Sequence, residues 1–195
     1  MRTFYGRPYP GGIMIAVIAG TNRPGSKTLA VARLVQKTLV DNGDQVTFLD
    51  LAKLPPDLMA GTSYAAKPDG FETFQEPILA ARGILTVVPE YNGSFPGILK
   101  YFVDMLRFPE SLYEKPSGFI GLSSGRWGAI RAVEQLQMIF QYRHAHLYGR
   151  RVFISDVGSV INETGNLVDP DLAQRLNTMV CGFSMFCDRL NGESG

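Results

Sequence analysis

The strongest chemical signal lies at residues 89–94, which read Pro-Glu-Tyr-Asn-Gly-Ser and follow an apolar run at 84–88. The Asn-Gly pair is typical of a tight turn, and Pro96-Gly97 then opens an amphipathic stretch. A turn of this kind contributes little to a core, but it presents backbone N–H groups and the ring of Tyr91. In open α/β sheets, ligands bind where strands end at their carboxyl side.

A second turn, Gly-Thr-Asn-Arg-Pro-Gly-Ser-Lys-Thr at 20–28, lies between the first apolar run and a helical pattern. Backbone N–H groups at a helix start and the helix dipole both favour an anion there. Hydroxyl groups and a guanidinium add hydrogen-bond donors, some of them charged. The turn therefore suits a phosphate monoester, with Thr21, Arg23, Ser26 and Thr28 as candidate ligands.

Other phosphate motifs fit this turn poorly. A Walker A loop, which binds nucleotides that are hydrolysed, consists of a glycine, four further residues and then Gly-Lys-Ser/Thr. Here Gly20 and Gly25 have that spacing, but Ser26 separates Gly25 from Lys27. The dinucleotide motif G-x-G-x-x-G is missing as well, because no second glycine stands two residues after the first. A plain polar turn that caps the following helix is the alternative for this segment taken alone.

A third turn, at 123–128, follows the fourth apolar run and contains serines, glycines and Trp127. Its glycines let the backbone come close to a flat ligand. Exposed N–H groups of 90–92 could bind polar atoms of a ring, and Tyr91 or Trp127 could cover a ring face by stacking. Each feature also has an interpretation without a ligand: the Asn-Gly pair is a common turn, and Trp127 is a half-buried aromatic residue at a helix start. Together the turns predict one ligand with an anionic end and a flat end.

These turns connect alternating strands and helices. Apolar runs that predict buried strands lie at 13–19, 45–51, 84–88, 117–122 and 151–155. Apolar residues at helical spacing predict helices at 28–41, 70–82, 97–106, 128–142 and 171–190, and a loop is expected at 54–69. The alternation predicts an α/β fold, a flavodoxin-like three-layer αβα sandwich around a five-stranded parallel sheet of order 2-1-3-4-5. Residues 1–12 are expected to form an extended tail and 13–195 a single domain.

The composition limits the partners and the compartment. Hydrophobic residues make up 45% of the 195 residues, and a net charge of +1 gives no field that would select nucleic acid or an anionic membrane. No apolar run approaches the roughly 20 residues of a membrane span. A signal peptide is not expected, because cleavage after the apolar run at 13–19 would remove the first predicted strand. Cys181 and Cys187 have no pairing motif and are expected to be free, buried thiols, which predicts a cytoplasmic location.

In its motifs the chain resembles the NADPH-dependent FMN reductase family, which includes flavin-dependent azo, quinone and chromate reductases. The matching segments are GTNRPGSKT, PEYNGSFPGILK-x-x-x-D and LSSGRWG-x-x-R-A-x-x-Q-L, and with the order of elements the resemblance covers residues 13–191. It implies non-covalently bound FMN, NADPH or NADH as co-substrate, and a homodimer or homotetramer. It also implies that the FMN phosphate is held by Thr21, Arg23, Ser26 and Thr28, and that the isoalloxazine borders Pro89, Glu90, Tyr91, Asn92, Gly93, Ser123, Ser124 and Gly125.

The resemblance implies an enzyme that passes a hydride from NAD(P)H through FMN to a small acceptor: a quinone, an azo compound, free flavin or a metal oxyanion. No side chain is expected to be catalytic. His144 and His146 are expected at the opposite sheet edge, without a metal-ligand set, and Asp104 in a cap or an ion pair. The alternatives are a flavin-binding electron carrier or redox sensor without its own turnover, and a flavin-free interaction domain.

The chain departs from the family pattern near the ring-side turns. Tyr101 stands where the family often has Asn after the motif's lysine. Arg126 and Trp127 separate Gly125 from Gly128, where the family often has consecutive glycines. These departures concern the shape of the substrate pocket more than the flavin site.

Overall fold

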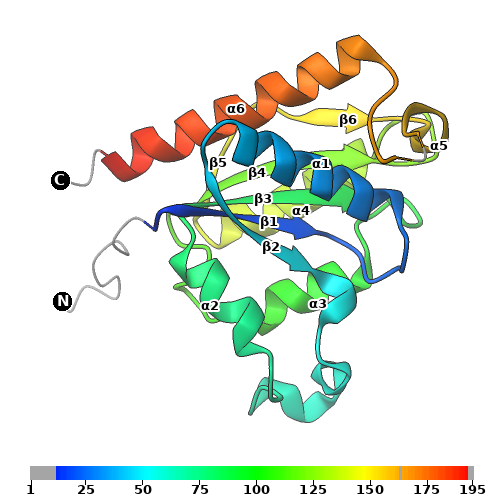
Figure 1. The fold of residues 1–195 in the computed structure, drawn as a ribbon. Helices are drawn as coiled ribbons and strands as arrows, with labels where there is room; N and C mark the ends of the chain where they lie inside the picture. The colour runs from blue at the N-terminus through cyan, green and yellow to red at the C-terminus, as the bar shows by residue number, and fades with distance from the viewer. Residues whose placement is uncertain (1–11, 163, 193–195) are drawn as a thin grey trace.

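The computed structural model describes residues 12–162 and 164–192, so the tail expected at 1–12 lies almost wholly outside the described residues. Within them, a parallel sheet is covered on both faces by helices (Figure 1). Its strands are β1 (Met14–Ala19), β2 (Gln45–Asp50), β3 (Gly83–Pro89), β4 (Pro116–Leu122), β5 (His146–Leu147) and β6 (Val152–Ile154). The order β2-β1-β3-β4-β5, with β6 also beside β4, confirms the flavodoxin-like order expected from the sequence.

The last position in the sheet differs from the single strand expected at 151–155. Two short strands share it: β5 pairs with Pro116 and Ser117 at the start of β4, and β6 pairs with 120–122 at its end. A strand of two residues is too short to produce an apolar pattern, so β5 could not be recognised in the sequence. The connection between the two strands places Arg150 and Arg151 at the outer edge of the sheet.

The helices are α1 (Lys27–Asp41), α2 (Glu72–Ala80), α3 (Gly97–Met105), α4 (Ile130–Tyr142), α5 (Val157–Val160) and α6 (Pro170–Gly192). Each helix expected from the spacing is present, with its ends within two residues of the expectation. The short α5 was not expected. The segment expected to be a loop contains 3₁₀ helices at Pro56–Met59 and Gly61–Tyr64, after another at Leu51–Lys53.

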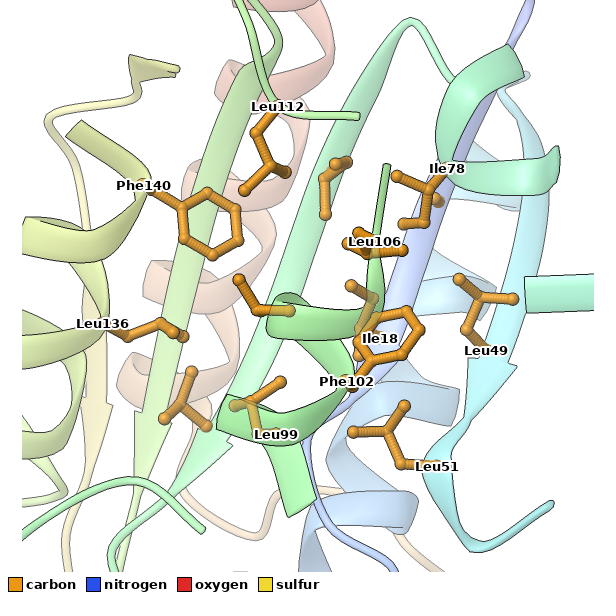
Figure 2. Close-up of a cluster of buried hydrophobic side chains, with 14 of the residues drawn as sticks. Ile18, Leu49, Leu51, Ile78, Leu99, Phe102, Leu106, Leu112, Leu136 and Phe140 are labelled. Atoms are coloured by element: carbon orange, nitrogen blue, oxygen red, sulfur yellow. The ribbon is translucent and has the colours of Figure 1, made fainter. Parts of the chain in front are cut away.

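Buried clusters on both faces of the sheet hold the layers together. Along β1, Ile15 and Val17 face one cluster and Ala16 and Ile18 face the other, as the strand period of two requires. Helices α1 and α6 cover the first cluster, and α2, α3 and α4 cover the second. Figure 2 shows the second cluster, in which the fully buried Phe102 of α3 lies over the sheet. Burying a side chain of this size contributes about 1.5–3 kcal/mol.

The carboxyl ends of β1, β3, β4 and β6 lie along one edge of the sheet, because these strands pair in parallel; the arrowheads in Figure 1 point to that edge. β1 and β3 are neighbours, although the chain runs from β1 outward to β2 before it returns to β3. This is the topological switch point, where ligands of such sheets bind. His146 pairs with Pro116 and His144 accepts the N–H of Glu114, so both histidines lie at the opposite edge, as expected.

Candidate cofactor site

The turn after β1 is held by its backbone. The Gly20 N–H donates to the carbonyl of Val87 on β3 at 2.9 Å, and a Cβ on Gly20 would lie 2.6 Å from that oxygen, so a side chain would clash there. Ser26 caps α1, because its Oγ accepts the N–H of Leu29 at 3.2 Å. The first turn of α1 carries no acidic residue. The positive end of its dipole is therefore open to an anion.

The candidate phosphate ligands differ in exposure. Thr21, Ser26 and Thr28 are buried, whereas Arg23 is exposed. The Arg23 N–H lies 3.3 Å from Oγ1 of Thr21, which fixes the backbone where the turn begins. The turn thus offers hydroxyl groups held inside the protein and one guanidinium at the surface.

The turn after β3 is a tight two-residue hairpin. Tyr91 and Ser94 exchange two backbone hydrogen bonds, of 2.7 and 3.1 Å, around Asn92 and Gly93. The φ angles of Asn92 and Gly93 are +52° and +78°. Two successive positive φ angles define a type I′ turn, which is the reason for the Asn-Gly sequence. The tight turn expected here is confirmed.

Tyr91 connects this hairpin to the first turn. Its hydroxyl lies 2.7 Å from Oγ1 of Thr21, and the two residues are 70 positions apart in the chain. The phenol is therefore anchored at its polar end beside the first turn. Trp127, the other aromatic candidate, is 60% exposed, so the alternative of a half-buried tryptophan is wrong.

The third turn is joined to the second by the backbone. The N–H of Glu90 donates to the carbonyl of Leu122 at 3.1 Å, and the N–H of Ser123 donates to the carbonyl of Ile154 at 3.0 Å. The N–H of Val157 donates back to the Ser123 carbonyl at 3.0 Å. All three turns therefore lie at one sheet edge, as expected. The connection between β6 and α5 joins them there, although it carries no motif in the sequence.

Part of the expected backbone chemistry is wrong. The N–H groups of Glu90 and Tyr91 are not exposed donors, because they bond to the carbonyls of Leu122 and Ser94. Of the N–H groups expected to face a ring, only that of Asn92 has no acceptor among the described residues. The hairpin and the β3–β4 ladder use the others, which sequence spacing alone does not reveal.

Glu90 brings an unpaired oxygen to the same place. Its Oε2 is buried and has no hydrogen-bond partner within the described part of the chain. Leaving a buried acceptor without a donor costs about 1–3 kcal/mol. This atom therefore suits a ligand that supplies an N–H or O–H group.

Gln135 of α4 belongs to the site but was not expected there. The Ser94 hydroxyl donates to Oε1 of Gln135 at 2.5 Å, and Nε2 of Gln135 lies 3.5 Å from the carbonyl of Gly93. Gln135 thus ties the hairpin to α4. In the sequence, the only indication of this role was that Gln135 is the glutamine of the third segment that matches the family. Its contact with Ser94 depends on how α4 packs against the hairpin.

Other expectations have mixed outcomes. Asp104 pairs with Lys100 at 2.6 Å, which confirms the expected ion pair. Cys187 is buried, but Cys181 is partly exposed, so the expectation of two buried thiols is wrong for Cys181. None of the helices in the described residues is long and apolar enough to cross a membrane. Within residues 12–162 and 164–192, no group of three His, Cys, Asp or Glu gathers into a possible metal site.

Comparison with known proteins relates this geometry to a family. A model of the NADPH-dependent FMN reductase family matches residues 13–159. An NAD(P)H-dependent FMN reductase of Pseudomonas aeruginosa is 30% identical over 184 residues, which cover 92% of this chain and 98% of that protein. A 2-hydroxy-1,4-benzoquinone reductase of a Burkholderia species is 30% identical over 172 residues, which cover 86% of this chain and 92% of that protein.

A solved structure of a flavoenzyme, an NAD(P)H:(acceptor) oxidoreductase from Paracoccus denitrificans, superposes with a TM-score of 0.76 at 22% identity, and the match covers 90% of this chain and 97% of that one. This likeness supports the fold that the strand order already indicates. The family model and the relatives together show that the chain belongs to the NADPH-dependent FMN reductase family, whose members are NAD(P)H oxidoreductases that use FMN.

Proposed function

We propose that this protein binds FMN at the carboxyl edge of its sheet and passes reducing equivalents from NAD(P)H to a quinone. The observation that carries the proposal is the joining of the turns by the Thr21–Tyr91 and Glu90–Leu122 hydrogen bonds. The choice of a quinone over an azo compound, free flavin or a metal oxyanion rests on the benzoquinone reductase among its relatives.

The residues at this edge fit FMN. A phosphate monoester needs donors and positive potential, which the hydroxyls of Thr21, Ser26 and Thr28, the Arg23 guanidinium and the start of α1 provide. The buried, unpaired Oε2 of Glu90 suits a ligand with N–H or O–H donors, and the isoalloxazine and the ribityl chain of FMN carry both. The ring-side residues of the proposal are Pro89, Glu90, Tyr91, Asn92, Gly93, Ser123, Ser124 and Gly125.

Bound FMN supplies the hydride and electron transfer, and the chain supplies its position. The hairpin at 91–94 is fixed by its own two hydrogen bonds, by Gln135 from α4 and by Thr21 from the first turn. A site held from three elements keeps its geometry when the cofactor binds, so little binding energy is spent on ordering the chain. No side chain is assigned a catalytic role.

We also propose a homodimer or homotetramer. A groove of about 700 Å³ between α3 and α4 is bordered by Phe108, Met138 and Tyr142, which are 66%, 67% and 78% exposed. Large apolar side chains gathered at a surface mark an interface more often than an isolated exposed one does. A second copy of the chain is the proposed occupant, and its own α3 and α4 would supply the matching apolar face.

The state of the cysteines supports a reducing, cytoplasmic environment. Cys181 and Cys187 are both free thiols. Proteins of oxidising compartments tend to carry disulfides, whereas thiols persist in the cytosol.

A visible absorption spectrum of the purified protein tests the proposal directly. The protein should be yellow, lose its flavin colour on anaerobic addition of NADPH, and regain it when a benzoquinone is added. A colourless protein that takes up no FMN would contradict the proposal. Slow reduction by both NADPH and NADH, together with fast electron exchange with a partner protein, would favour an electron carrier instead.

A further inference from the structure

Segment 156–161, which contains α5, contacts two of the three cofactor turns but carries no motif. It lies at the sheet edge to which the strand arrowheads point (Figure 1). Near its start, the N–H of Val157 donates to the carbonyl of Ser123 in the third turn at 3.0 Å. At its end, the carbonyl of Ile161 accepts a hydrogen bond of 3.3 Å from Nζ of Lys27, the first residue of α1. The segment therefore connects the third turn to the first.

The segment is packed against the body of the protein. Val157 and Ile161 are 6% and 4% exposed, and both belong to the buried cluster that also contains Val31 of α1. The N–H of Asp156 lies 3.4 Å from the carbonyl of Gly125, which gives the third turn a second contact with the segment. Close-packed side chains transmit a displacement from one end of a segment to the other. The positions of the two turns are therefore linked through it.

This link completes a ring of contacts around the proposed cofactor site. The first and second turns are joined by the Thr21–Tyr91 bond, and the second and third turns by the bond from Glu90 to Leu122. Lys27 joins the third turn to the first through the segment described above. Each turn is thus connected to both of the others.

Lys27 occupies an electrostatically unfavourable position. A positive charge in the first turn of a helix opposes the helix dipole, and Lys27 is the first residue of α1. The side chain is exposed, and within the described residues it forms no ion pair. The stability of α1 therefore gives no reason for a lysine here, whereas the contact with Ile161 does.

We propose that Lys27 is a positioning residue of the cofactor site, which acts through the Ile161 carbonyl to keep the first and third turns at a fixed separation. The inference rests on the proposed function, because that function assigns the phosphate of FMN to the first turn and the ring to the third. A ligand that reaches both turns is released more easily when they can move apart. Lys27 therefore slows the release of FMN by keeping the site preorganised, without binding the phosphate itself.

The rate of FMN dissociation from the holoprotein tests the proposal. Lys27→Met should raise this rate about fivefold, the scale of one hydrogen bond, and Lys27→Arg, which keeps a charged donor, should restore a rate near that of the wild type. Lys37→Met is the matched control and should have no effect, because Lys37 is an exposed lysine of α1 that pairs with Asp41. Recovery of flavin fluorescence after dilution measures the rates.

Amide hydrogen exchange separates positioning from a direct contact with phosphate. With and without FMN, the Val157 N–H should exchange about fivefold faster in Lys27→Met than in the wild type, because the end of its segment is released. Faster FMN dissociation with unchanged exchange at Val157 would overturn the proposal, since Lys27 would then act on the phosphate. A wild type that takes up no FMN would overturn the proposed function as well, whereas FMN uptake with equal dissociation rates in the wild type and Lys27→Met would overturn this inference alone.

Discussion

Thr21 and Tyr91 show how single residues build the proposed cofactor site. Their hydroxyl groups share a hydrogen bond of 2.7 Å that joins the first turn to the hairpin. Thr21 is buried and also accepts the N–H of Arg23, so the phenol, the hydroxyl and the turn backbone form one chain of hydrogen bonds. Such a chain is worth more when complete than its members are separately.

Arg23 is the residue that we expect to contribute most of the charge to phosphate binding. Arg23→Ala should weaken FMN binding by about 1.5–3 kcal/mol, the scale of a hydrogen bond to a charged group. Fluorescence titration of FMN into the apoprotein measures the change. Arg189→Ala, which removes an exposed arginine of α6, is the control and should have no effect. An unchanged FMN affinity in Arg23→Ala would exclude Arg23 from the site.

The Thr21–Tyr91 bond should appear as energetic coupling. We expect Thr21→Val and Tyr91→Phe each to weaken FMN binding, and the double variant to lose about 0.5–1.5 kcal/mol less than the sum of the two. A double-mutant cycle on FMN affinity, repeated on the free energy of unfolding, measures this coupling. Strictly additive losses in both would mean that the two hydroxyls act independently.

Lys115 makes a prediction about pH. Its Nζ donates to the carbonyls of Leu79 and Ala81 at 3.0 and 2.6 Å, and burial lowers its pKa from 10.5 to about 8. Between these values the unfolded chain binds more protons at Lys115 than the folded chain does, so this residue makes stability rise with pH. Burial also raises the pKa of Cys187 from 9.0 to about 12, which has the opposite effect above its ordinary pKa.

Comparison with Lys115→Met isolates the effect of Lys115. From about pH 8 to pH 9 the wild type should gain about 1 kcal/mol in free energy of unfolding relative to the variant. Urea denaturation at a series of pH values measures the difference. A constant difference across that window would mean that the folded Lys115 keeps an ordinary pKa.

Among the elements of the fold, the short turns form the proposed cofactor site, and helices α1 and α4 fix their positions. Gln135 bonds to Ser94, so α4 fixes the position of the hairpin that follows β3. Ser26 ends the first turn and caps α1, so the candidate phosphate site and the helix start are the same structure. Substitutions that remove the Ser94–Gln135 bond or the Ser26 cap should therefore weaken cofactor binding more than they disturb the packing of the core.

Gly93 offers a test of the hairpin. A Cβ on Gly93 would meet no atom within 4 Å, but the φ angle of +78° is costly for alanine. Gly93→Ala should lower the free energy of unfolding by about 1 kcal/mol through backbone strain and should also weaken FMN binding. Gly97→Ala is the matched control, because its Cβ also meets open space and its φ is ordinary. Urea unfolding compares the two, and equal effects would contradict a strained hairpin.

At the scale of the whole molecule, the sheet separates two faces with different surroundings. Helices α1 and α6 close one face, and α2, α3 and α4 cover the other, where apolar side chains also reach the surface beside the α3–α4 groove. The carboxyl edge between these layers carries the proposed cofactor site. The proposed ligand site and the proposed contact with a second copy therefore lie on different parts of the molecule.

Met138 tests the second copy. Met138→Glu places a charge in the proposed interface and should lower the mass of the oligomer, from dimer to monomer or from tetramer to dimer, because burying an unpaired carboxylate is strongly unfavourable. Met185→Glu is the control: Met185 of α6 is 55% exposed, close to the 67% of Met138, but lies outside the α3–α4 groove. Analytical ultracentrifugation measures the mass. A wild-type monomer, or dissociation by both variants alike, would contradict this interface.

Patterns in the sequence were sufficient to predict the strand order, the five longer helices and the place of the three turns. Periodicity and glycine position carry that information locally, because each helix or turn depends on residues close together in the chain. The Asn92-Gly93 pair also predicted the tight turn after the third strand.

Contacts between residues far apart in the chain could not be predicted and follow from the packing of the fold. They are the Thr21–Tyr91 bond, the bond from Ser94 to Gln135, and the hydrogen bonds that the Glu90 and Tyr91 N–H groups make inside the protein. The split between β5 and β6 likewise depends on which residues of β4 each short strand pairs with. These features follow from how strands and helices pack at a shared edge. No spacing within one segment encodes which partner another segment will bring to it.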